Sequence, residues 1–378
     1  MKIIIAPDSY KESLTAMDVA IAIEKGFKQV LPDAQYVKLP MADGGEGTVQ
    51  SMVDATGGTI IEHTVTGPLG QNVDGFFGLL GEGKTAVIEM AAASGLHLVS
   101  PELRNPLITT TLGTGELIKA ALDHGVKHII VGIGGSATND GGIGMAQALG
   151  IKLLDAQGNA LGHGGGELAK LATIDCSQLD SRLAQVRLEV ACDVDNPLCG
   201  TKGASAVFGP QKGATPEMVT ILDENLAHYA SIIKQQLGVD VRDMAGAGAA
   251  GGMGAALLGL LNAELRPGIE IVMDAVRLDE IVADADLVIT GEGRIDSQTI
   301  HGKTPIGVAR TAKKHSLPVI GIAGCLSADC GVVHEHGLDA VFAVVNRSVD
   351  LPTALAEAAE NVELTARNVA AAFCMTRR

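Results

Sequence analysis

The feature that most constrains the fold is the alternation of short apolar runs with helical segments at both ends of the chain. A strand-like run at 2–6 precedes a helical pattern that reaches about Val30, with Ser13 as the expected N-cap, and a second strand is expected at 36–40. The C-terminal third repeats this order, with strand-like runs at 286–290, 318–323 and 340–345, a helix at 305–315 and a long helix from Thr353. Such alternation predicts a parallel sheet that is covered by helices on both faces.

The middle of the chain follows a different pattern. Three strand-like runs between 59 and 91 are separated by glycine turns and predict an antiparallel β-meander, and residues 151–162 predict a hairpin. A length of 378 residues fits two domains. We therefore expect an α/β protein with a discontinuous Rossmann-like domain, an inserted mixed α/β domain and a ligand cleft between them. The expected bounds are 1–58 with 276–378 for the first domain and 59–275 for the second.

Composition excludes several classes of protein. The 28 Lys and Arg residues against 44 Asp and Glu give a net charge of −16, which repels nucleic acid. The apolar runs are shorter than the roughly 20 residues that span a bilayer, and no basic-then-apolar leader precedes them. The six cysteines form no CxxC pair, as in a protein of a reducing compartment. We expect a cytoplasmic protein without a membrane partner, and the sequence leaves a homo-oligomer open.

Two glycine motifs match phosphate-binding patterns by spacing alone. Residues 78–85 satisfy G-x-x-x-x-G-K-[ST], but Thr85 opens a strand-like run where a P-loop requires a helix, so we interpret the glycines as a hairpin turn. Residues 246–251 satisfy G-x-G-x-x-G without a buried strand before them, which argues against a dinucleotide site. Either anion binding by the amides of Gly248 and Gly251 at a helix start or tight helix packing fits this motif.

A third glycine loop has the sequence context of a ligand site. Residues 132–142 follow an apolar strand at 128–133 and precede a helix at 143–149. Glycines allow the backbone to approach a ligand, and short polar side chains at a helix start stabilise phosphate or carboxylate. The candidate binding residues are Gly134, Gly135, Ser136, Thr138 and Asn139, and an elaborate capped turn is the alternative.

Charged residues follow several of the expected strands, where ligands bind in open α/β sheets. Asp8 and Asp43 follow the first two strands and suit Mg²⁺, while Lys11 suits a phosphate. Loop hydrogen bonds or surface ion pairs would explain the same residues. Asp193 emerges from a strand-like run at 188–192 and suits a base or a metal ligand, with a turn as the alternative.

The last charged loop, at 291–298, comes directly after a buried strand. It carries Glu292, Arg294 and Asp296, and alternating charges at a strand end are costly unless they bind something. The histidines lack HxH or HExxH spacing, so zinc is not expected, and no G-x-S-x-G elbow indicates a serine hydrolase.

These motifs together resemble the bacterial glycerate kinase family over essentially the whole chain. The resemblance is carried by P-D-S-Y-K-E-S-L at 7–14, A-D-G-G-E-G-T at 42–48, E-M-A-A-A-S-G-L at 89–96, G-T-G-E-L at 113–117, G-I-G-G-S-A-T-N-D-G-G at 132–142, A-C-D-V at 191–194, F-G-P-Q-K-G-A at 208–214, G-A-G-A-A-G-G-M-G at 246–254 and I-T-G-E-G-R-I-D-S-Q at 289–298. It implies ATP and D-glycerate as substrates, Mg²⁺ as cofactor, 2-phosphoglycerate as product and two α/β domains around a cleft.

Phosphoryl transfer requires positioning, charge neutralisation and a carboxylate that accepts the hydroxyl proton. As a hypothesis, Asp193 is the base, Asp43 and Asp296 lie on the Mg²⁺ side, and Lys11, Lys212 and Arg294 contact phosphate or carboxylate. Asp8, Ser9 and Glu292 are further binding candidates. Two alternatives remain: an NAD-dependent hydroxy-acid dehydrogenase, which would use residues 246–251, and a non-catalytic sensor of small acids.

Overall fold

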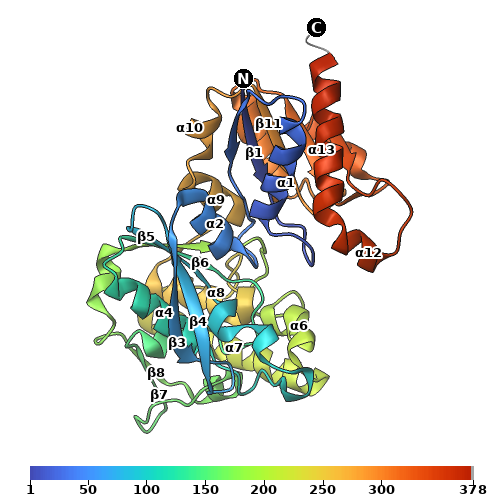
Figure 1. Cartoon of the computed structure of the whole chain (residues 1–378). Helices are drawn as coiled ribbons and strands as arrows, with labels where there is room; N and C mark the ends of the chain where they lie inside the picture. The colour runs from blue at the N-terminus through green and yellow to red at the C-terminus, as the bar shows by residue number, and fades with distance from the viewer. Residues whose placement is uncertain (376–378) are drawn as a thin grey trace. The chain divides into compact units, whose positions relative to one another are not determined.

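The computed structural model describes residues 1–375 (Figure 1). The chain forms two compact units. The first contains Met1–Asp43, Gln50–Gly57 and Ile269–Arg378, and the second contains Gly44–Val49 and Gly58–Gly268. The chain therefore leaves the first unit and returns to it, so that its N-terminal and C-terminal parts share one sheet.

The first unit is built on a five-stranded, all-parallel sheet in the order β15-β13-β11-β1-β2. Its strands are β1 (Lys2–Pro7), β2 (Gln35–Lys38), β11 (Leu287–Gly291), β13 (Val319–Ala323) and β15 (Ala340–Ala343). The central strands β1, β11 and β13 are buried almost throughout, as apolar runs covered on both faces must be. The expected parallel sheet is confirmed, and its strands match the expected runs within a few residues.

Helices cover both faces of this sheet. On one face, α1 (Ala16–Lys28) and α13 (Ala358–Met375) pack on each other, α1 also packs on β1, and α13 packs on β13 (Figure 1). The two helices approach closely at Gly26, where a Cβ would collide with the carbonyl oxygen of Glu363. On the other face, α11 (Thr304–Lys314) packs on β11, β13 and β1.

Two expected helix boundaries were wrong. The N-cap of α1 is Thr15, whose hydroxyl accepts a hydrogen bond from the Asp18 amide, whereas Ser13 Oγ donates to the Tyr10 carbonyl across a turn. The helix expected from Thr353 is two helices, α12 (Leu351–Ala356) and α13. The first of these starts earlier because Asp350 caps it, accepting a hydrogen bond from the Thr353 amide.

The second unit contains a mixed six-stranded sheet in the order β10-β9-β6-β5-β4-β3. Its strands are β3 (Thr59–Thr66), β4 (Asn72–Leu79), β5 (Thr85–Glu89), β6 (His128–Gly132), β9 (Arg187–Ala191) and β10 (Glu264–Arg266). The first three form the expected antiparallel meander, and β5, β6, β9 and β10 are parallel. Thr85 opens β5, Gly78 lies in β4 and the turn at 81–84 joins the two strands, which confirms a hairpin and not a P-loop.

Helices and a small hairpin complete the second unit. The core contains residues of α4 (Leu112–Asp123), α5 (Ile143–Ala148), α7 (Pro216–Leu237) and α8 (Ala249–Leu261). The hairpin expected at 151–162 is reduced to one bridge between Leu154 and Ala160, because β7 (Lys152–Leu154) pairs with the more distant β8 (Thr173–Asp175). Two further helices of this unit are α3 (Ala91–Ser94) and α6 (Ala204–Phe208). The remaining elements of the first unit are α10 (Leu278–Val282), β12 (Arg294–Ile295) and β14 (Cys325–Leu326), while α2 (Thr48–Thr56) and α9 (Gly268–Ala275) each include residues of both units. No helix within residues 1–375 is both long and apolar enough to span a membrane.

Candidate active-site residues

Three carboxylates of the first unit lie near the carboxyl ends of neighbouring strands. Asp8 follows β1, Asp43 follows β2 and Glu292 follows β11. The backbone keeps the strand ends in register, since the Asp8 amide donates to the Gly291 carbonyl over 2.8 Å. The negative charges of Asp43 and Glu292 both act on Asp8. The expected gathering of acidic side chains at this edge of the sheet is therefore present in the structure.

Asp8 is held by its neighbours in chain and in space. Its Oδ1 accepts hydrogen bonds from the Ser9 amide (2.6 Å) and the Ser9 hydroxyl (3.3 Å), and its Oδ2 accepts one from Thr304 Oγ1 (2.7 Å). Burial, and then the charge of Asp43, raise the pKa of Asp8 to about 6 although these hydrogen bonds oppose the shift. Lys11 lies exposed three residues further along the loop.

The loop after β11 carries both acidic and basic groups. Glu292 Oε1 accepts a hydrogen bond from Thr299 Oγ1 (2.6 Å), and Glu292 Oε2 accepts one from Lys303 Nζ (3.4 Å). Burial raises the pKa of Glu292 despite these partners. Arg294 points outward with 67% of its side chain exposed, donates from Nε to Ser327 Oγ (3.0 Å), and lies 3.7 Å from Asp296 Oδ2. Its guanidinium can therefore meet an anionic ligand.

The acidic residues of the first unit suit a magnesium ion that also binds phosphate. Among the residues that the structure describes, no three His, Cys, Asp or Glu side chains form a ready metal cage. Mg²⁺ is usually held by one or two protein carboxylates together with substrate phosphates and water. Burial is the main cause of the raised pKa of Asp8, and the charge of Asp43 adds to it; a cation would relieve this second effect. Asp43 has the carboxylate chemistry that such an ion requires, and so does Asp296, which follows the short strand β12.

In the second unit, the loop at 132–142 joins β6 to α5, and its N-terminal part is exposed to solvent. Gly134 and Gly135 are exposed, and Gly135 has a φ of 71°, which favours glycine. Two backbone hydrogen bonds hold this end in place: Leu96 N donates to Gly135 O (2.8 Å), and Ala137 N donates to Ser94 O (2.9 Å).

The rest of this loop is buried and polar. Ser136, Thr138 and Asn139 are all buried, and Lys212 is 1% exposed. Lys212 Nζ donates to Ser136 Oγ (2.7 Å) and to the Thr138 carbonyl (2.6 Å). Burial lowers the pKa of Lys212 to about 7, and the opposing effect is the charge of Asp140. The lysine that was expected to contact phosphate thus lies behind the loop.

The buried side of the loop also has unused hydrogen-bonding capacity. Asn139 Nδ2 donates to Ser205 Oγ (3.0 Å). Within the described part of the chain, Asn139 Oδ1 and Thr138 Oγ1 are two of the four buried side-chain atoms without a hydrogen-bond partner. Because buried polar atoms without a partner are rare in folded proteins, these two atoms indicate that the loop has a functional role in addition to a structural one.

Asp193 is exposed just after β9, as expected for a carboxylate that accepts a proton. Its Oδ1 accepts a hydrogen bond from the Gly268 amide (2.8 Å), which holds the carboxylate in place. The glycines at 44 and 45 border the same strand ends, because Gly44 packs on Ala191 and on Gly132. The acidic loop after β2 therefore continues into the second unit as a glycine segment.

The glycines at 246–251 pack against other loops. No strand precedes them, and Ala250, Gly251 and Gly252 have left-handed backbone angles at the start of α8, so the dinucleotide fingerprint lacks its structural context. A Cβ on Gly251 would collide with the Thr138 carbonyl, and the Gly248 amide already donates to Asn196 O (3.0 Å). Of the two interpretations left open for Gly248 and Gly251, these contacts favour packing.

Sequence reasoning missed three residues that build these sites. Asp140 is buried and accepts hydrogen bonds from Thr111 (amide 2.9 Å, hydroxyl 2.8 Å) and from the Gly142 amide (3.0 Å). Glu89, at the end of β5, accepts one from the Val49 amide (2.8 Å) at the start of α2, and burial raises its pKa. Thr304 binds Asp8. The sequence did contain a signal for Glu89, because it is a charged residue at the end of an apolar strand.

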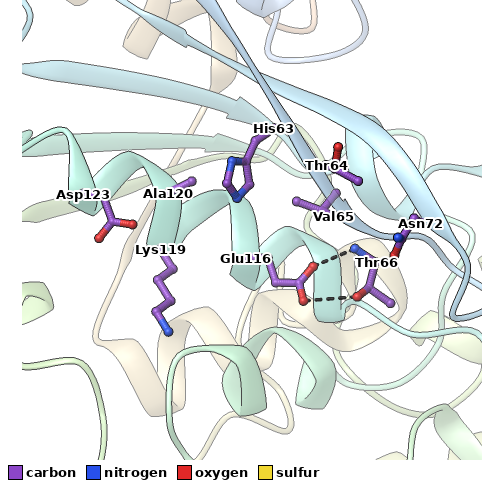
Figure 2. A pocket seen from close by; sticks show the side chains of 9 residues that line it. All are labelled: His63, Thr64, Val65, Thr66, Asn72, Glu116, Lys119, Ala120 and Asp123. Carbon is purple, nitrogen blue, oxygen red and sulfur yellow. Dashed lines mark hydrogen bonds between the residues drawn. The ribbon is translucent and has the colours of Figure 1, made fainter.

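A pocket of about 340 Å³ lies elsewhere, between β3 and α4 (Figure 2). It is lined by His63, Thr64, Val65, Thr66, Asn72, Glu116, Lys119, Ala120 and Asp123. Glu116 is occupied there, since it accepts hydrogen bonds from the Thr66 amide (2.6 Å) and hydroxyl (3.1 Å). None of the predicted site residues lines this pocket, and we assign no part of the candidate site to it.

The fold and these residues define an α/β enzyme whose polar groups collect at the ends of parallel strands and in a glycine loop before a helix. The sequence profile of the Glycerate kinase family matches residues 3–374. The chain is 64% identical to glycerate kinase of Bacillus subtilis (strain 168) and 61% identical to glycerate 2-kinase of Escherichia coli (strain K12), covering 100% of this chain and 99% of the relative in both comparisons. It therefore belongs to the glycerate kinase family.

Solved structures agree. A crystal structure assigned to glycerate kinase 2 of Salmonella typhimurium LT2 superimposes with a TM-score of 0.93 at 63% sequence identity. The superposition covers 100% of this chain and 99% of the other. The α/β architecture expected from the sequence is confirmed by this match.

Proposed function

We propose that the chain is an ATP-dependent kinase that converts D-glycerate to 2-phosphoglycerate and so feeds a small hydroxy acid into central carbon metabolism. The observation that carries the proposal is full-length identity of 61% to a glycerate 2-kinase. The carboxylates at the ends of β1, β2, β9 and β11 supply the groups that phosphoryl transfer requires.

Asp193 is proposed as the general base. Its exposed carboxylate would accept the proton of the glycerate hydroxyl while that oxygen forms the new P–O bond, and the bond between the γ-phosphorus and the bridging oxygen breaks to release ADP. The hydrogen bond from the Gly268 amide holds the carboxylate in one orientation. General-base catalysis requires a carboxylate in a fixed position within hydrogen-bond reach of the proton that it accepts.

The charged residues of the first unit are proposed to bind the anionic parts of the substrates. Asp43 and Asp296 would hold Mg²⁺, which neutralises phosphate charge when bound. Lys11 and the exposed Arg294 would contact phosphate or the glycerate carboxylate, because a guanidinium binds a carboxylate with two parallel hydrogen bonds. Asp8 and Glu292 are proposed to support these contacts while they are held by hydrogen bonds from Thr304 and Lys303, and Ser9 supports them through its hydrogen bonds to Asp8.

The glycine loop of the second unit is proposed to bind an anionic group of ATP or glycerate. Its ligand-facing part would be the exposed pair Gly134 and Gly135, with Ser136, Thr138 and Asn139 behind them. Gly248 and Gly251 would support this loop by packing, since Gly251 lies against the Thr138 carbonyl.

The test is a coupled assay of ADP release with Mg-ATP and D-glycerate, followed by phosphorus NMR of the product. We expect glycerate-dependent ADP release and 2-phosphoglycerate. Formation of 3-phosphoglycerate would refute the position of transfer, and absence of glycerate-dependent ADP release would refute the activity. Binding of glycerate without ADP release would then indicate a sensor, and a fluorescence change on NADH titration would indicate a dehydrogenase.

A further inference from the structure

We propose that Lys212 is a positioning residue that acts through Ser136, holding the loop at 132–142 in the shape that binds a substrate anion. It would not touch the substrate itself. The inference rests on the proposed function, which it deepens by separating the part of the loop that meets the ligand from the part that holds it.

Burial shows on which side of the loop Lys212 acts. The side chain is 1% exposed, and its Nζ ends in hydrogen bonds to two groups of the same loop, Ser136 Oγ and the Thr138 carbonyl. By contrast, Gly134 and Gly135, on the same loop, are exposed. A ligand that approaches the glycines therefore meets the backbone of the loop, while Lys212 ties the next residues together from inside.

The bond to Ser136 has a chemical consequence. A hydroxyl has one proton and two lone pairs. Because Ser136 Oγ accepts from Lys212, the hydroxyl proton is left to donate to a different group, and Ser136, itself buried, directly follows the exposed glycines. In the described part of the chain, no backbone acceptor pairs with the amides of Gly134, Gly135 or Ser136. Consecutive amides and one oriented hydroxyl form a site for carboxylate or phosphate oxygen.

The charge of Asp140 favours the charged form of the buried Lys212, which is the form that donates hydrogen bonds to the loop. Asp140 is the charged group that acts on Lys212, and Asp140 is itself held by the amides of Thr111, Gly142 and Gly144 and by the hydroxyl of Thr111. Burying an amine is costly, and an apolar side chain of similar length would fill the same space. What methionine could not supply is the pair of hydrogen bonds to Ser136 and Thr138.

The 208–214 segment is itself fixed, so that Lys212 has a defined place to act from. Lys212 ends a short 3₁₀ turn, Pro210–Lys212, and Gly213 then adopts a φ of 90° where a Cβ would collide with the Arg104 carbonyl. Arg104 in turn donates from Nη1 to the Gln211 carbonyl (3.3 Å). The lysine therefore projects from a rigid turn, as a positioning residue should.

The test is a double-mutant cycle with Lys212→Met, Ser136→Ala and the double variant. Dissociation constants for ADP and for D-glycerate are measured separately by calorimetry, and KM and kcat by the ADP-release assay. Lys202→Met, which removes an exposed lysine on the other side of α6, is the matched control. Melting temperatures show whether each variant is folded, and Lys212→Leu, which also removes the N–H donor, replaces Lys212→Met if the latter does not fold.

We expect each single variant to weaken binding of one ligand by about tenfold or more, with the double variant no weaker than the more severe single variant. Weaker glycerate binding would identify the anion as a carboxylate, and weaker ADP binding would identify it as a phosphate. Multiplied effects in the double variant would overturn the inference, because Lys212 would then act independently of Ser136. So would unchanged binding of both ligands in Ser136→Ala.

This design separates the two proposals. Absence of glycerate-dependent ADP release by the wild-type protein would refute the proposed function, yet the calorimetric constants would still decide whether Lys212 acts through Ser136.

Discussion

Thr304 Oγ1 donates a 2.7 Å hydrogen bond to Asp8 Oδ2 and so ties the first residue of α11 to the residue that follows β1. This bond favours the ionised carboxylate, but burial and the charge of Asp43 outweigh it, and the pKa of Asp8 rises to about 6. The fold thus raises the pKa of a carboxylate at a strand end, and such shifts are common for functional residues.

Asp8→Asn is therefore expected to stabilise the protein at pH 8 while lowering activity. Because the pKa of Asp8 in the folded protein lies above the ordinary aspartate value of 3.8, the folded protein retains a proton between about pH 4 and pH 6 that the unfolded chain loses. Stability contributed by protonated Asp8 is present below pH 4 and is lost as the pH rises through 6. We expect a gain of about 1–3 kcal/mol for the variant at pH 8 and a smaller one at pH 5.

Urea unfolding at the two pH values measures this difference for Asp8→Asn. An equal effect at pH 5 and pH 8 would show that Asp8 does not titrate near 6.

Asp193→Asn is expected to lower kcat by about 10²- to 10⁴-fold, the usual contribution of a general base. Folding should be unaffected, because the amide oxygen can still accept the hydrogen bond from Gly268. Asp195→Asn, at an exposed carboxylate two residues away, is the control and should retain activity. Near-wild-type turnover in Asp193→Asn would mean that another group accepts the proton.

Two glycine substitutions should separate packing from ligand approach. Gly251→Ala places a Cβ against the Thr138 carbonyl at a φ of 67°, so we expect a loss of stability of about 2 kcal/mol or more. Gly134→Ala meets nothing closer than 3.7 Å and should fold normally while raising the KM of a substrate. Melting temperatures and KM values of the two variants provide the comparison. A normally stable Gly251→Ala protein would contradict the packing role.

Glu89→Ala should destabilise the start of α2, because the Val49 amide loses its carboxylate partner inside the protein. We expect a cost of about 1–3 kcal/mol in the free energy of unfolding. Glu89→Gln keeps one oxygen acceptor and should cost less. Chemical denaturation of both variants measures the difference, and a larger loss for Gln than for Ala would rule out this explanation.

Removal of divalent metal should abolish ADP release without unfolding the protein. The reason is that Mg²⁺ is proposed to bind with ATP, and residues 1–375 contain no three-ligand metal cage that the fold could depend on. EDTA should therefore leave the melting temperature unchanged, and added Mg²⁺ should restore turnover. A large fall in melting temperature with EDTA would point to a structural ion instead.

The sequence predicted those parts of the site that follow from strand order. Asp8, Asp43 and Glu292 lie near the carboxyl ends of neighbouring parallel strands, so the alternation of strands and helices was enough to bring them together. The rejection of a P-loop at 78–85 followed from the strand after it, which β5 confirms.

The parts that sequence could not predict depend on tertiary packing. Nothing in the pattern around Lys212 tells whether a lysine between glycines points inward or outward, and the structure places it inside. The spacing at 246–251 satisfies a fingerprint, but only the structure shows that the segment lacks a preceding strand and that Gly251 lies against the Thr138 carbonyl. Ser13 and Thr15 are equally good caps by residue type, and the turn at Tyr10 decides between them.

The contact of α1 with α13 has a consequence for synthesis on the ribosome. The first helix to emerge must wait for the last one, since the two pack so closely at Gly26 that no side chain fits between them. The second unit, mostly one continuous stretch, can fold while β1 still lacks its neighbour β11. A prematurely terminated chain therefore exposes an unpaired strand and the apolar side of α1, which chaperones and proteases recognise.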